Sequence, residues 1–408
     1  MSDKSFSLAY VGSVVPDEPQ FRTDAFSRSG NLFQANTLRA LTQAGCRPER
    51  VLSYVPVPSW PRGPLWVAGA VVEVEELPVR LLGFLNVTPI KQSWLGMRTL
   101  MALLGWAFGV GWSSRKVICC YNLTVPPVAF LWMAAKLGNA RLVPITCDIN
   151  IPGETEPNTA AHRFDFAQHK FWLPRMDGVV AVTDAIIRDF APGRPHLIME
   201  GGIPRTRMEE ATPEVASLSN PGPFVVVMAG SLEEFNGVLV AIAALKLAPD
   251  LKIRLVIAGD GPQRELVQAA ARVDERIRYV GFVSHEAVLA LYREAALLLN
   301  LRVTRHIRTP YFFPGKLIEY LSSGTPVLST DCSHVRRGYS GMLYLSSGEE
   351  ARDIVSDLRR IKAIPPAELA SMAGRAREWM NAHMTWSQQG RRLAEFLASC
   401  TQAPRNGA

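Results

Sequence analysis

The chain has 408 residues, enough for two domains that each bury a core, and its formal net charge of +7 is modest for that length. Lys and Arg form no cluster interleaved with aromatic residues, which argues against nucleic-acid binding. The six cysteines lack metal-ligand spacing, and the adjacent Cys119 and Cys120 are a poor basis for a disulfide framework. We therefore expect reduced thiols, a cytoplasmic protein and no nucleic-acid partner.

The first half, residues 1–208, alternates predicted strands and helices, as a parallel doubly wound sheet does. Gly12 ends the first strand, and Ser29, Gly30 and Asn31 open a helix. The predicted strands lie at 7–12, 116–121, 140–146 and 178–182. The first residues lack the basic and apolar regions of a signal peptide.

An apolar stretch at 99–112 is shorter than the ~20 residues that a membrane-spanning helix needs. Trp94 and Arg98 precede it and Arg115 follows it, a pattern typical of a helix lying flat on a membrane interface. The other interpretation, which we favour, is a buried helix packed on a sheet. A peripheral contact with the anionic inner face of the plasma membrane is the open alternative.

Residues 209–223 are polar, rich in Pro, Ser and Thr, and are the best linker candidate. The second half, 224–380, repeats the α/β alternation, and the apolar run 225–229 fits a central strand buried on both faces. Its predicted strands lie at 224–230, 254–258, 277–280, 296–300 and 326–329. From Glu349 we expect a helix that directs Asp353, Asp357, Arg359 and Arg360 outward, and then a C-terminal helical segment, 381–408.

The most informative stretch, 313–330, reads as a short helix between a loop and a buried strand. Pro314 and Gly315 suit a helix start, and Gly324 suits its C-cap. The first-turn N–H groups have no partners inside a helix and form an anion site. Lys316 adds a positive charge beside that positive end, which favours a bound anion. A phosphate-bearing ligand is the simplest such anion.

Three predicted strands of the second half end in glycine, at Gly230, Gly259 and Gly281. In an open parallel sheet ligands bind outside the carboxyl ends of the strands, and glycines there let backbone N–H groups approach a phosphate. One such glycine is weak evidence, since strand-to-helix turns need glycine anyway, but three favour a ligand crevice. Gly261 is not followed by the third glycine of a dinucleotide fingerprint, which disfavours a nicotinamide enzyme.

These elements resemble the donor-binding domain of the family 4 glycosyltransferases, retaining enzymes with two Rossmann-like domains facing a cleft (the GT-B architecture). The segments that carry the resemblance are 229–232, 236–237, 257–262, 279–283, 298–302, 313–321 and 324–327. Residues 313–320 are similar to the Phe-Pro-Ser-Lys-x-x-Glu-Tyr motif of a subgroup that builds exopolysaccharide or capsule. The first half resembles the family more loosely, and the helix at Thr385 and Trp386 looks like one that crosses back to the first domain.

The resemblance implies a role for each matching residue. Glu319 would hold the donor ribose, because a carboxylate accepts two hydrogen bonds from a vicinal diol, and Val283 would read the edge of the base. Lys316, Glu319 and Asp148 are the predicted catalytic residues. The predicted donor-binding residues are Gly230, Ser231, Asn236, Gly259, Gly261, Gly281, Phe282, Val283, Asn300, Arg302, Tyr311, Gly315 and Leu317.

Three positions depart from the family pattern. Tyr311 stands where the family usually has a first glutamate, Ser231 replaces the usual arginine, and Asn236 replaces the usual lysine. Losing both cations would cost several kcal/mol of leaving-group stabilisation. We expect Arg302, Arg305, Arg308 and Lys316 to be the candidates for compensation.

In the first half, the predicted acceptor-side residues are Gly12, Ser29, Gly30 and Asn31. Asp148 follows a strand, where the family often places a His or Asp facing the cleft; an equal alternative is an Asp capping the turn before Pro152. His162 and His169 lie on a polar helix and are expected to be surface histidines. No Asp-x-Asp motif stands in a fitting context, so we expect neither a metal nor another cofactor.

The resemblance thus implies a retaining, metal-independent hexosyltransferase. It would move a sugar from a nucleotide diphosphate sugar to a sugar or lipid-linked glycan acceptor, in polysaccharide or glycoconjugate biosynthesis. The losses at Ser231, Asn236 and Tyr311 favour an alternative, a non-catalytic scaffold of the same fold in a biosynthetic complex. A nucleotide-sugar epimerase is a third possibility, although the first half offers few of the acid and base residues that such an enzyme needs.

Overall fold

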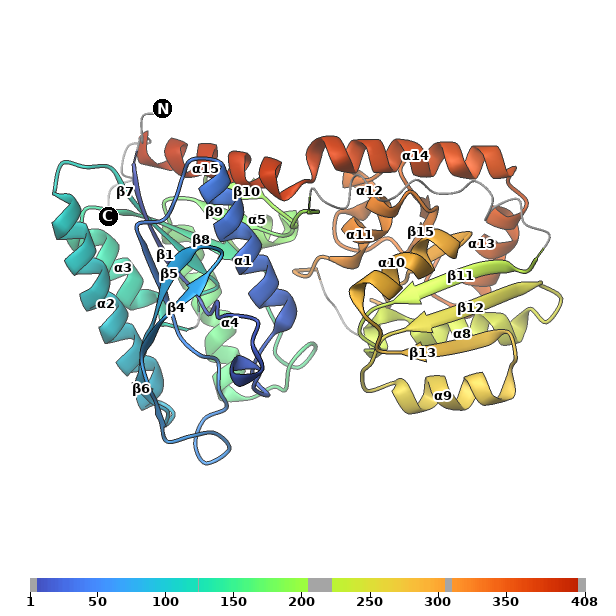
Figure 1. Cartoon of the computed structure of the whole chain (residues 1–408), viewed down its shortest axis with the longest axis horizontal. Coiled ribbons are helices and arrows are strands. Elements are labelled where there is room, and N and C mark those ends of the chain that lie inside the picture. The colour runs from blue at the N-terminus through green and yellow to red at the C-terminus, as the bar shows by residue number, and fades with distance from the viewer. Residues whose placement is uncertain (1–5, 124, 205–221, 305–309, 403–408) are drawn as a thin grey trace. The chain divides into compact units, whose positions relative to one another are not determined.

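The computed structural model describes residues 6–123, 125–204, 222–304 and 310–402. Contacts divide the chain into two compact units, Met1–Gly201 with Trp386–Ala408, and Gly202–Thr385. Each unit has a largely parallel sheet flanked by helices, so the α/β fold class with two Rossmann-like halves is confirmed (Figure 1). Nearly all of the predicted linker 209–223 lies outside the described residues, and the predicted limits 1–208, 224–380 and 381–408 stay predictions.

The sheet of the first unit has eight strands in the order β10-β9-β8-β7-β1-β2-β5-β4. All neighbours run parallel except β4 and β5, which pair antiparallel. Their bounds are β1 Ser7–Val11, β2 Arg50–Ser53, β4 Ala70–Val74, β5 Leu77–Leu81, β7 Lys116–Tyr121, β8 Arg141–Thr146, β9 Val179–Ala181 and β10 His196–Ile198. A small antiparallel pair, β3 Trp66–Val67 and β6 Phe84–Leu85, stands apart. The sequence did not predict β2 to β6.

Helices cover both faces of this sheet, with α2 and α3 on one side and α1 on the other (Figure 1). The bounds are α1 Arg28–Gln43, α2 Ile90–Val110, α3 Val128–Leu137, α4 Ala160–Trp172, α5 Asp184–Phe190 and α15 Trp386–Gln402, with one-turn helices at Pro19–Phe21 and Leu173–Arg175. The last helix, α15, packs closely on α1, because a Cβ on Gly390 would lie 2.3 Å from the Ala40 carbonyl oxygen. The Phe33 and Trp386 rings meet edge to face at 5.4 Å.

Helix α2 begins earlier than predicted and has two different faces. Leu95, Leu103 and Trp106 are buried against the unit, as we expected for a helix packed on a sheet. Large apolar side chains on the other face are exposed, so the buried interpretation holds for one face only. No helix within the described part of the chain is long and apolar enough to cross a membrane.

The sheet of the second unit has six parallel strands in the order β13-β12-β11-β14-β15-β16. The strands are β11 Phe224–Ala229, β12 Ile253–Ala258, β13 Ile277–Gly281, β14 Leu297–Asn300, β15 Val327–Ser329 and β16 Tyr344–Leu345. The helices are α8 Val238–Leu247, α9 Arg264–Val273, α10 His285–Glu294, α11 Lys316–Ser323, α12 Val335–Gly338, α13 Ala351–Lys362 and α14 Pro366–His383, with a one-turn helix at Glu234–Asn236. Val226 and Val227 of β11 belong to separate buried clusters, which confirms a central strand covered on both faces.

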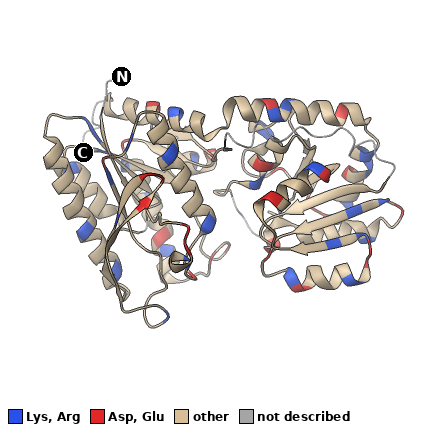
Figure 2. Ribbon diagram, in the orientation of Figure 1, with Lys and Arg blue, Asp and Glu red and all other residues tan. Residues whose placement is uncertain are grey.

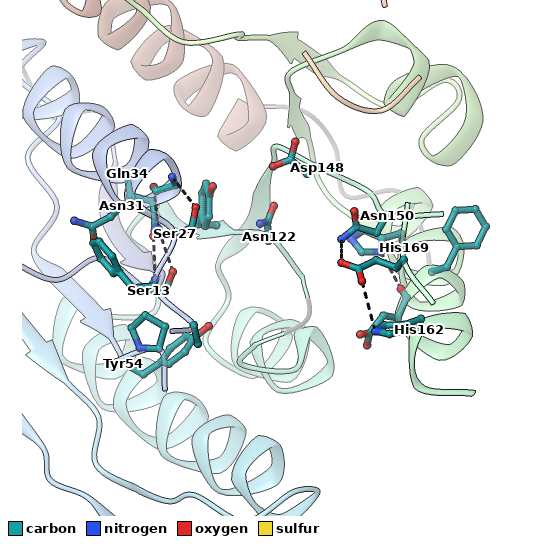
Figure 3. Close-up of a pocket in the computed structure, with 18 residues that line it drawn as sticks. Ser13, Ser27, Asn31, Gln34, Tyr54, Asn122, Asp148, Asn150, His162 and His169 are labelled. Carbon is teal, nitrogen blue, oxygen red and sulfur yellow. Dashed lines mark hydrogen bonds and ion pairs between the residues drawn. The ribbon is translucent and has the colours of Figure 1, made fainter. Parts of the chain in front are cut away.

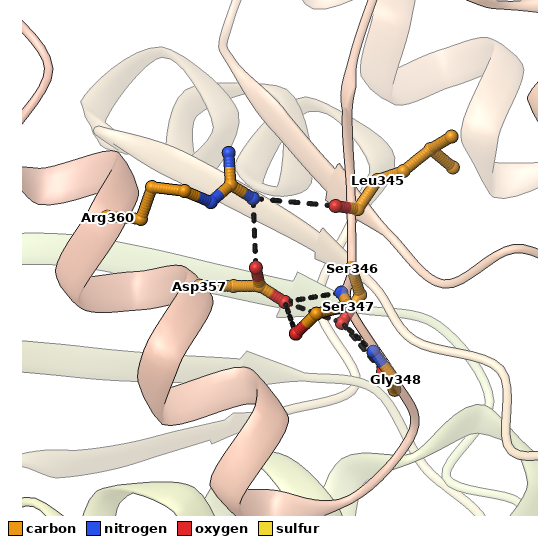
Figure 4. Close-up of polar contacts among 6 residues, drawn as sticks. All are labelled: Leu345, Ser346, Ser347, Gly348, Asp357 and Arg360. Atoms are coloured by element: carbon orange, nitrogen blue, oxygen red, sulfur yellow. Dashed lines mark hydrogen bonds and ion pairs between the residues drawn. The ribbon is translucent and has the colours of Figure 1, made fainter.

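The predicted outward direction of Asp357 is wrong. Its side chain is only 3% exposed, and one carboxylate oxygen accepts hydrogen bonds from the Ser346 hydroxyl at 2.8 Å and from the Ser347 amide at 2.9 Å (Figure 4). The other oxygen accepts from Arg360 at 2.9 Å. The polar side of α13 therefore anchors the turn after β16. Asp353 has a local role instead, because it accepts a hydrogen bond from the Glu350 amide and caps the helix.

All six cysteines are free, as predicted, and five of them are buried. Burial raises the pKa of the Cys120 thiol to about 12, so this thiol stays protonated near neutral pH.

Candidate functional site

Three glycines that end neighbouring strands of the second unit lie in a row. Gly259 donates its N–H to the Gly281 carbonyl oxygen at 2.8 Å, and a Cβ on Gly259 would lie only 1.8 Å from the Gly230 carbonyl oxygen. Gly230 has φ of 146° and Gly259 has φ of 141°, values that L side chains rarely adopt. The structure therefore brings together the strand-end glycines that the sequence singled out. Gly261 lies next in the chain and packs against the Leu232 backbone.

Helix α11 is fixed to the end of β11 by one side chain. The Tyr320 hydroxyl accepts a hydrogen bond from the Ala229 amide at 2.8 Å and donates one to the Ala229 carbonyl oxygen at 2.9 Å. The start of the helix thus lies beside Gly230, where the Lys316 Cγ would be 3.7 Å from an added Cβ. Gly324 ends the helix with φ of 78°, as predicted for a C-cap.

Lys316 and Glu319 form an ion pair, with Nζ and Oε2 2.9 Å apart. We expected a bound anion to offset the Lys316 charge, but Glu319 already offsets it. A ligand that binds both side chains must therefore share this pair or open it. Gly315 is exposed with open space beyond its Cα, whereas the Leu317 amide donates to the Pro314 carbonyl oxygen at 2.8 Å and is used inside the turn.

The other predicted donor residues are spread over the same edge of the sheet. Asn236 donates to the Ser231 carbonyl oxygen at 2.8 Å. Asn300 donates to the Ser329 hydroxyl at 2.8 Å, and the Arg302 guanidinium stacks over Phe235 at 4.8 Å.

The predicted donor-binding residues also differ in solvent exposure. Asn300 and Arg302 are buried, Tyr311 and Val283 are half-buried, and Phe282 is 73% exposed. Arg305 and Arg308 lie outside the described residues. The roles of all these residues toward a donor stay predictions.

The first unit contains a cavity of about 480 Å³. One wall comes from the loop after β1 and from α1, and the opposite wall comes from the segment after β8 and from α4, as Figure 3 shows. Gly30, Asn31 and Asp148, which the sequence placed on the acceptor side or among the catalytic residues, line this cavity. Gly12 and Ser29 are not among its lining residues.

Two amides hold the wall formed by the loop after β1. Asn31 accepts a hydrogen bond from the Val15 amide at 2.9 Å and donates to the Val15 carbonyl oxygen at 3.0 Å. Gln34 accepts from the Ser13 amide at 2.9 Å and lies so close to Gly12 that a Cβ there would be 2.2 Å from its oxygen. Gly12 and Asn31 therefore shape the wall. Ser27 caps α1 by accepting a hydrogen bond from the Gly30 amide at 3.2 Å.

Asn122 positions the segment that carries Asp148. Its backbone has φ of 56°, and its side-chain oxygen accepts a hydrogen bond from the Cys147 amide at 3.2 Å. This contact ties the residue before Asp148 to the end of β7. Asp148 is exposed and faces the cavity, and burial, with a smaller contribution from Asp148, raises the pKa of the Cys147 thiol.

The expectation that His169 is a surface histidine is wrong. Its side chain is 6% exposed, lines the cavity, and donates Nδ1–H to the Asp165 carbonyl oxygen at 2.8 Å. Burial lowers the pKa of His169, so the ring is neutral and Nε2 is a hydrogen-bond acceptor. His162 also lines the cavity, and its Nε2 lies 4.0 Å from the Glu156 carboxylate.

A sequence signal for this placement exists but is weak. Phe166 and His169 are three residues apart on α4, the spacing of a shared helix face. The Phe166 and Phe190 rings pack edge to face at 5.4 Å, which turns that face inward. Within the described residues, no group of three or more His, Cys, Asp and Glu side chains is arranged to hold a metal ion.

Residues 223–362 match a family model described as glycosyl transferases group 1. That segment contains β11 to β16 and therefore the whole glycine row together with the Lys316–Glu319 pair. No curated protein matches the sequence.

Several solved structures have the same fold over nearly the whole chain. HepE from Anabaena in complex with UDP is 14% identical, with a TM-score of 0.67 over 97% of this chain and 100% of that chain. Sucrose-phosphate synthase from Thermosynechococcus elongatus is 16% identical, with a TM-score of 0.66 over 95% of this chain and 98% of that one. A glycosyltransferase from Rickettsia africae is 13% identical, with a TM-score of 0.65 over 98% and 99%. At these low identities the TM-scores show a shared fold alone, and the match over 223–362 makes the second unit similar to a group 1 glycosyl transferase domain.

Proposed function

We propose that this protein is a retaining glycosyltransferase that moves a hexosyl group from a nucleotide diphosphate sugar to a sugar acceptor. The observation that carries the proposal is the meeting of the Gly230–Gly259–Gly281 row with the start of α11, inside the segment that matches the family. Strand-end glycines and helix amides suit a diphosphate, which needs close backbone approach and positive potential. Among the described residues, the amides of Gly315 and Lys316 have no partner, and a diphosphate would supply one.

In this proposal Glu319 accepts hydrogen bonds from the ribose hydroxyls while Lys316 offsets charge on the leaving diphosphate. A uridine nucleotide is the first donor to test, because HepE has been solved with UDP and with UDP-glucose. The exposed Phe282 would meet the base. Neither step requires a metal ion, since helix amides and Lys316 supply the positive potential.

The first-unit cavity would receive the acceptor. Its size fits a sugar ring, and its walls combine polar side chains with the aromatic rings of Tyr54, Phe26 and Phe166. A lipid-linked glycan of a cytoplasmic polysaccharide or glycoconjugate pathway is the acceptor that we propose.

The exposed face of α2 would bring the enzyme to the anionic membrane that holds such an acceptor. Five apolar side chains recur at helical spacing on that face, Ile90, Trp94, Met97, Met101 and Phe108, and each is at least 40% exposed. The Trp66 and Trp94 rings pack edge to face at 6.1 Å and widen this surface, hereafter the α2 face. The helix has no acidic residue, and only basic positions are coloured as charged along its ribbon in Figure 2: Lys91, which is buried, and the half-buried Arg98. Apolar burial plus basic charge is the combination that binds anionic lipid.

The test of the donor site is Glu319→Ala with UDP-glucose titrated by calorimetry. Losing hydrogen bonds to a charged group should weaken binding about thirtyfold. Glu265→Ala removes an exposed carboxylate of α9 in the same unit and should leave the affinity unchanged. An unchanged affinity in Glu319→Ala would remove the ribose assignment.

The substitutions at Ser231, Asn236 and Tyr311 favour one competing function, a non-catalytic scaffold with this fold. Release of free sugar from UDP- or GDP-sugars by the purified protein would exclude it. An epimerase would instead return an isomerised nucleotide sugar, which chromatography of the same reaction would detect.

A further inference from the structure

The charged side chains that line the first-unit cavity have one sign. Asp148, Glu156 and Asp165 contribute carboxylates, while no Lys or Arg is among the lining residues, all of which are described. The two histidines do not reverse this balance, because burial lowers the pKa of His169 and His162 lies beside Glu156. The cavity is therefore a region of negative potential.

A largely buried histidine presents an acceptor atom to the cavity. The His169 ring uses Nδ1 within its own helix, and within the described residues Nε2 has no hydrogen-bond partner, although the side chain is 94% buried. The Nε2 atom is not fully enclosed, and His169 lines the cavity, so water or a ligand there supplies its hydrogen-bond partner. Since neutral Nε2 accepts a hydrogen bond, the missing partner is a donor: a hydroxyl or an ammonium group.

The carboxylates of the cavity also favour a hydrogen-bond donor as ligand. Asp165 has no side-chain hydrogen bond among the described residues, and partial burial raises the pKa of its carboxyl group. Glu156 accepts one weak hydrogen bond, from Asn150 at 3.3 Å. These groups accept hydrogen bonds from hydroxyls and attract a cation, but they repel a phosphate or a carboxylate.

We propose that this cavity selects a non-anionic, hydroxyl-rich ring, with an amino sugar preferred over a neutral sugar and a sugar phosphate excluded. The inference deepens the proposed function, because it names the class of acceptor. It also orients a lipid-linked glycan: the terminal sugar enters the cavity, and the phosphate that joins glycan to lipid stays outside. Enzymes that act on a phosphorylated acceptor would need a cation here instead.

The experiment measures binding of glucosamine, glucose and glucose 6-phosphate to the full-length protein by ligand-observed NMR, at a pH where the amine is protonated. We expect affinity to fall in that order, with about a tenfold span between the first and the last. Asp165→Asn should reduce the difference in affinity between glucosamine and glucose 6-phosphate. Asp165→Lys should raise the affinity for glucose 6-phosphate above that for glucosamine. Asp165 suits this change because its side chain lies at the exposed rim of α4.

Glu265→Lys, an equal charge reversal on exposed α9, is the matched control and should keep the wild-type order. Equal binding of the three sugars, no sugar binding, or an order that ignores Asp165 would each overturn the inference. Titration of the same samples with UDP-glucose keeps the two proposals separate. If UDP-glucose binds but the three sugars bind equally, only the inference about the cavity is contradicted. If the sugars are selected but UDP-glucose does not bind, only the proposed donor site is contradicted.

Discussion

The carboxyl ends of the parallel strands carry different chemistry in the two units. In the second unit they are glycines beside a helix start and Lys316. The Gly230 and Gly259 amides are used inside the sheet, so the groups available to a ligand are the Gly315 and Lys316 amides and one cation. In the first unit the corresponding strand ends carry Tyr121, Asn122 and Asp148, and a cavity lined by carboxylates follows. One sheet edge is suited to anions and the other to hydroxyls and amines. A sugar nucleotide is an anion and a sugar acceptor carries hydroxyl groups, so the two ligands differ in charge as the two sheet edges do. The two units therefore share a fold but not the charge at the strand ends.

The largest expected effect comes from a substitution in the glycine row of the second unit, the edge suited to anions. In Gly259→Ala the new Cβ would lie 1.8 Å from the Gly230 carbonyl oxygen in a backbone conformation that suits glycine. We expect the free energy of unfolding to fall by about 3 kcal/mol and UDP-glucose binding to be lost. Urea unfolding measures the first effect and calorimetry measures the second. Gly374→Ala in α14 is the control, because no atom lies within 4 Å of its added Cβ. The free energy of unfolding of this control should rise slightly, because alanine favours a helix more than glycine does. Equal stability of the two variants would contradict the role given to the glycine row.

The next effect concerns the one cation at the start of α11. Lys316→Met keeps the length of the side chain but removes its charge, and UDP-glucose affinity should fall about tenfold. Because Lys316 and Glu319 are paired at 2.9 Å, the double variant with Glu319→Ala should lose less than the sum of the two single losses. Calorimetric titration of the four proteins gives this coupling. Strict additivity would mean that the pair does not act as a unit in donor binding.

The elements of the second unit could be predicted because their signals are local. Each glycine stands directly after an apolar run, and Gly324 follows a helix of clear periodicity. The β4–β5 hairpin was missed because its turn uses Glu75 and Glu76, both with positive φ, where sequence rules expect glycine or asparagine. Arg39 of α1 holds Glu75 through two hydrogen bonds, at 2.5 and 2.7 Å, a long-range contact that no local pattern reveals.

The candidate sites divide in the same way. The chemistry near Lys316 follows from a short stretch of sequence, whereas the burial of His169 and of Asp357 depends on partners elsewhere in the fold. Asp357 is covered by the turn at Ser346 and Ser347, and His169 is covered by Phe190 and neighbouring elements. A polar residue on a polar helix is expected to be exposed until its neighbours in space are known.

A smaller effect tests whether the first unit also carries the membrane contact. Trp94→Ser combined with Met101→Ser removes apolar area from the α2 face and should weaken binding to vesicles that contain anionic lipid by roughly fivefold. Co-sedimentation with vesicles measures this. Leu247→Ser combined with Val273→Ser removes two exposed apolar side chains from the second unit and should leave vesicle binding unchanged. Equal losses in both variants, or binding that ignores lipid charge, would contradict the assignment.

The smallest effect is the pH dependence that His169 gives to stability. Burial lowers its pKa in the folded protein below the ordinary value of 6.5, whereas the unfolded chain keeps that value. The unfolded state therefore binds more protons as the pH falls from about 7.5 to about 5.5, so stability is full above 6.5 and is lost on acidification. His169→Gln lacks this proton, so its urea midpoint should fall less than that of the wild type over the same range. Glu156, His162 and Asp165, which line the same cavity, are unchanged between the two proteins, so their contributions largely cancel in the comparison. His196→Gln, at an exposed site, should keep the wild-type pH dependence. If both variants follow the wild type, the neutral buried state of His169 is wrong, and with it the unfilled acceptor from which the preference for hydroxyl and amine ligands was argued.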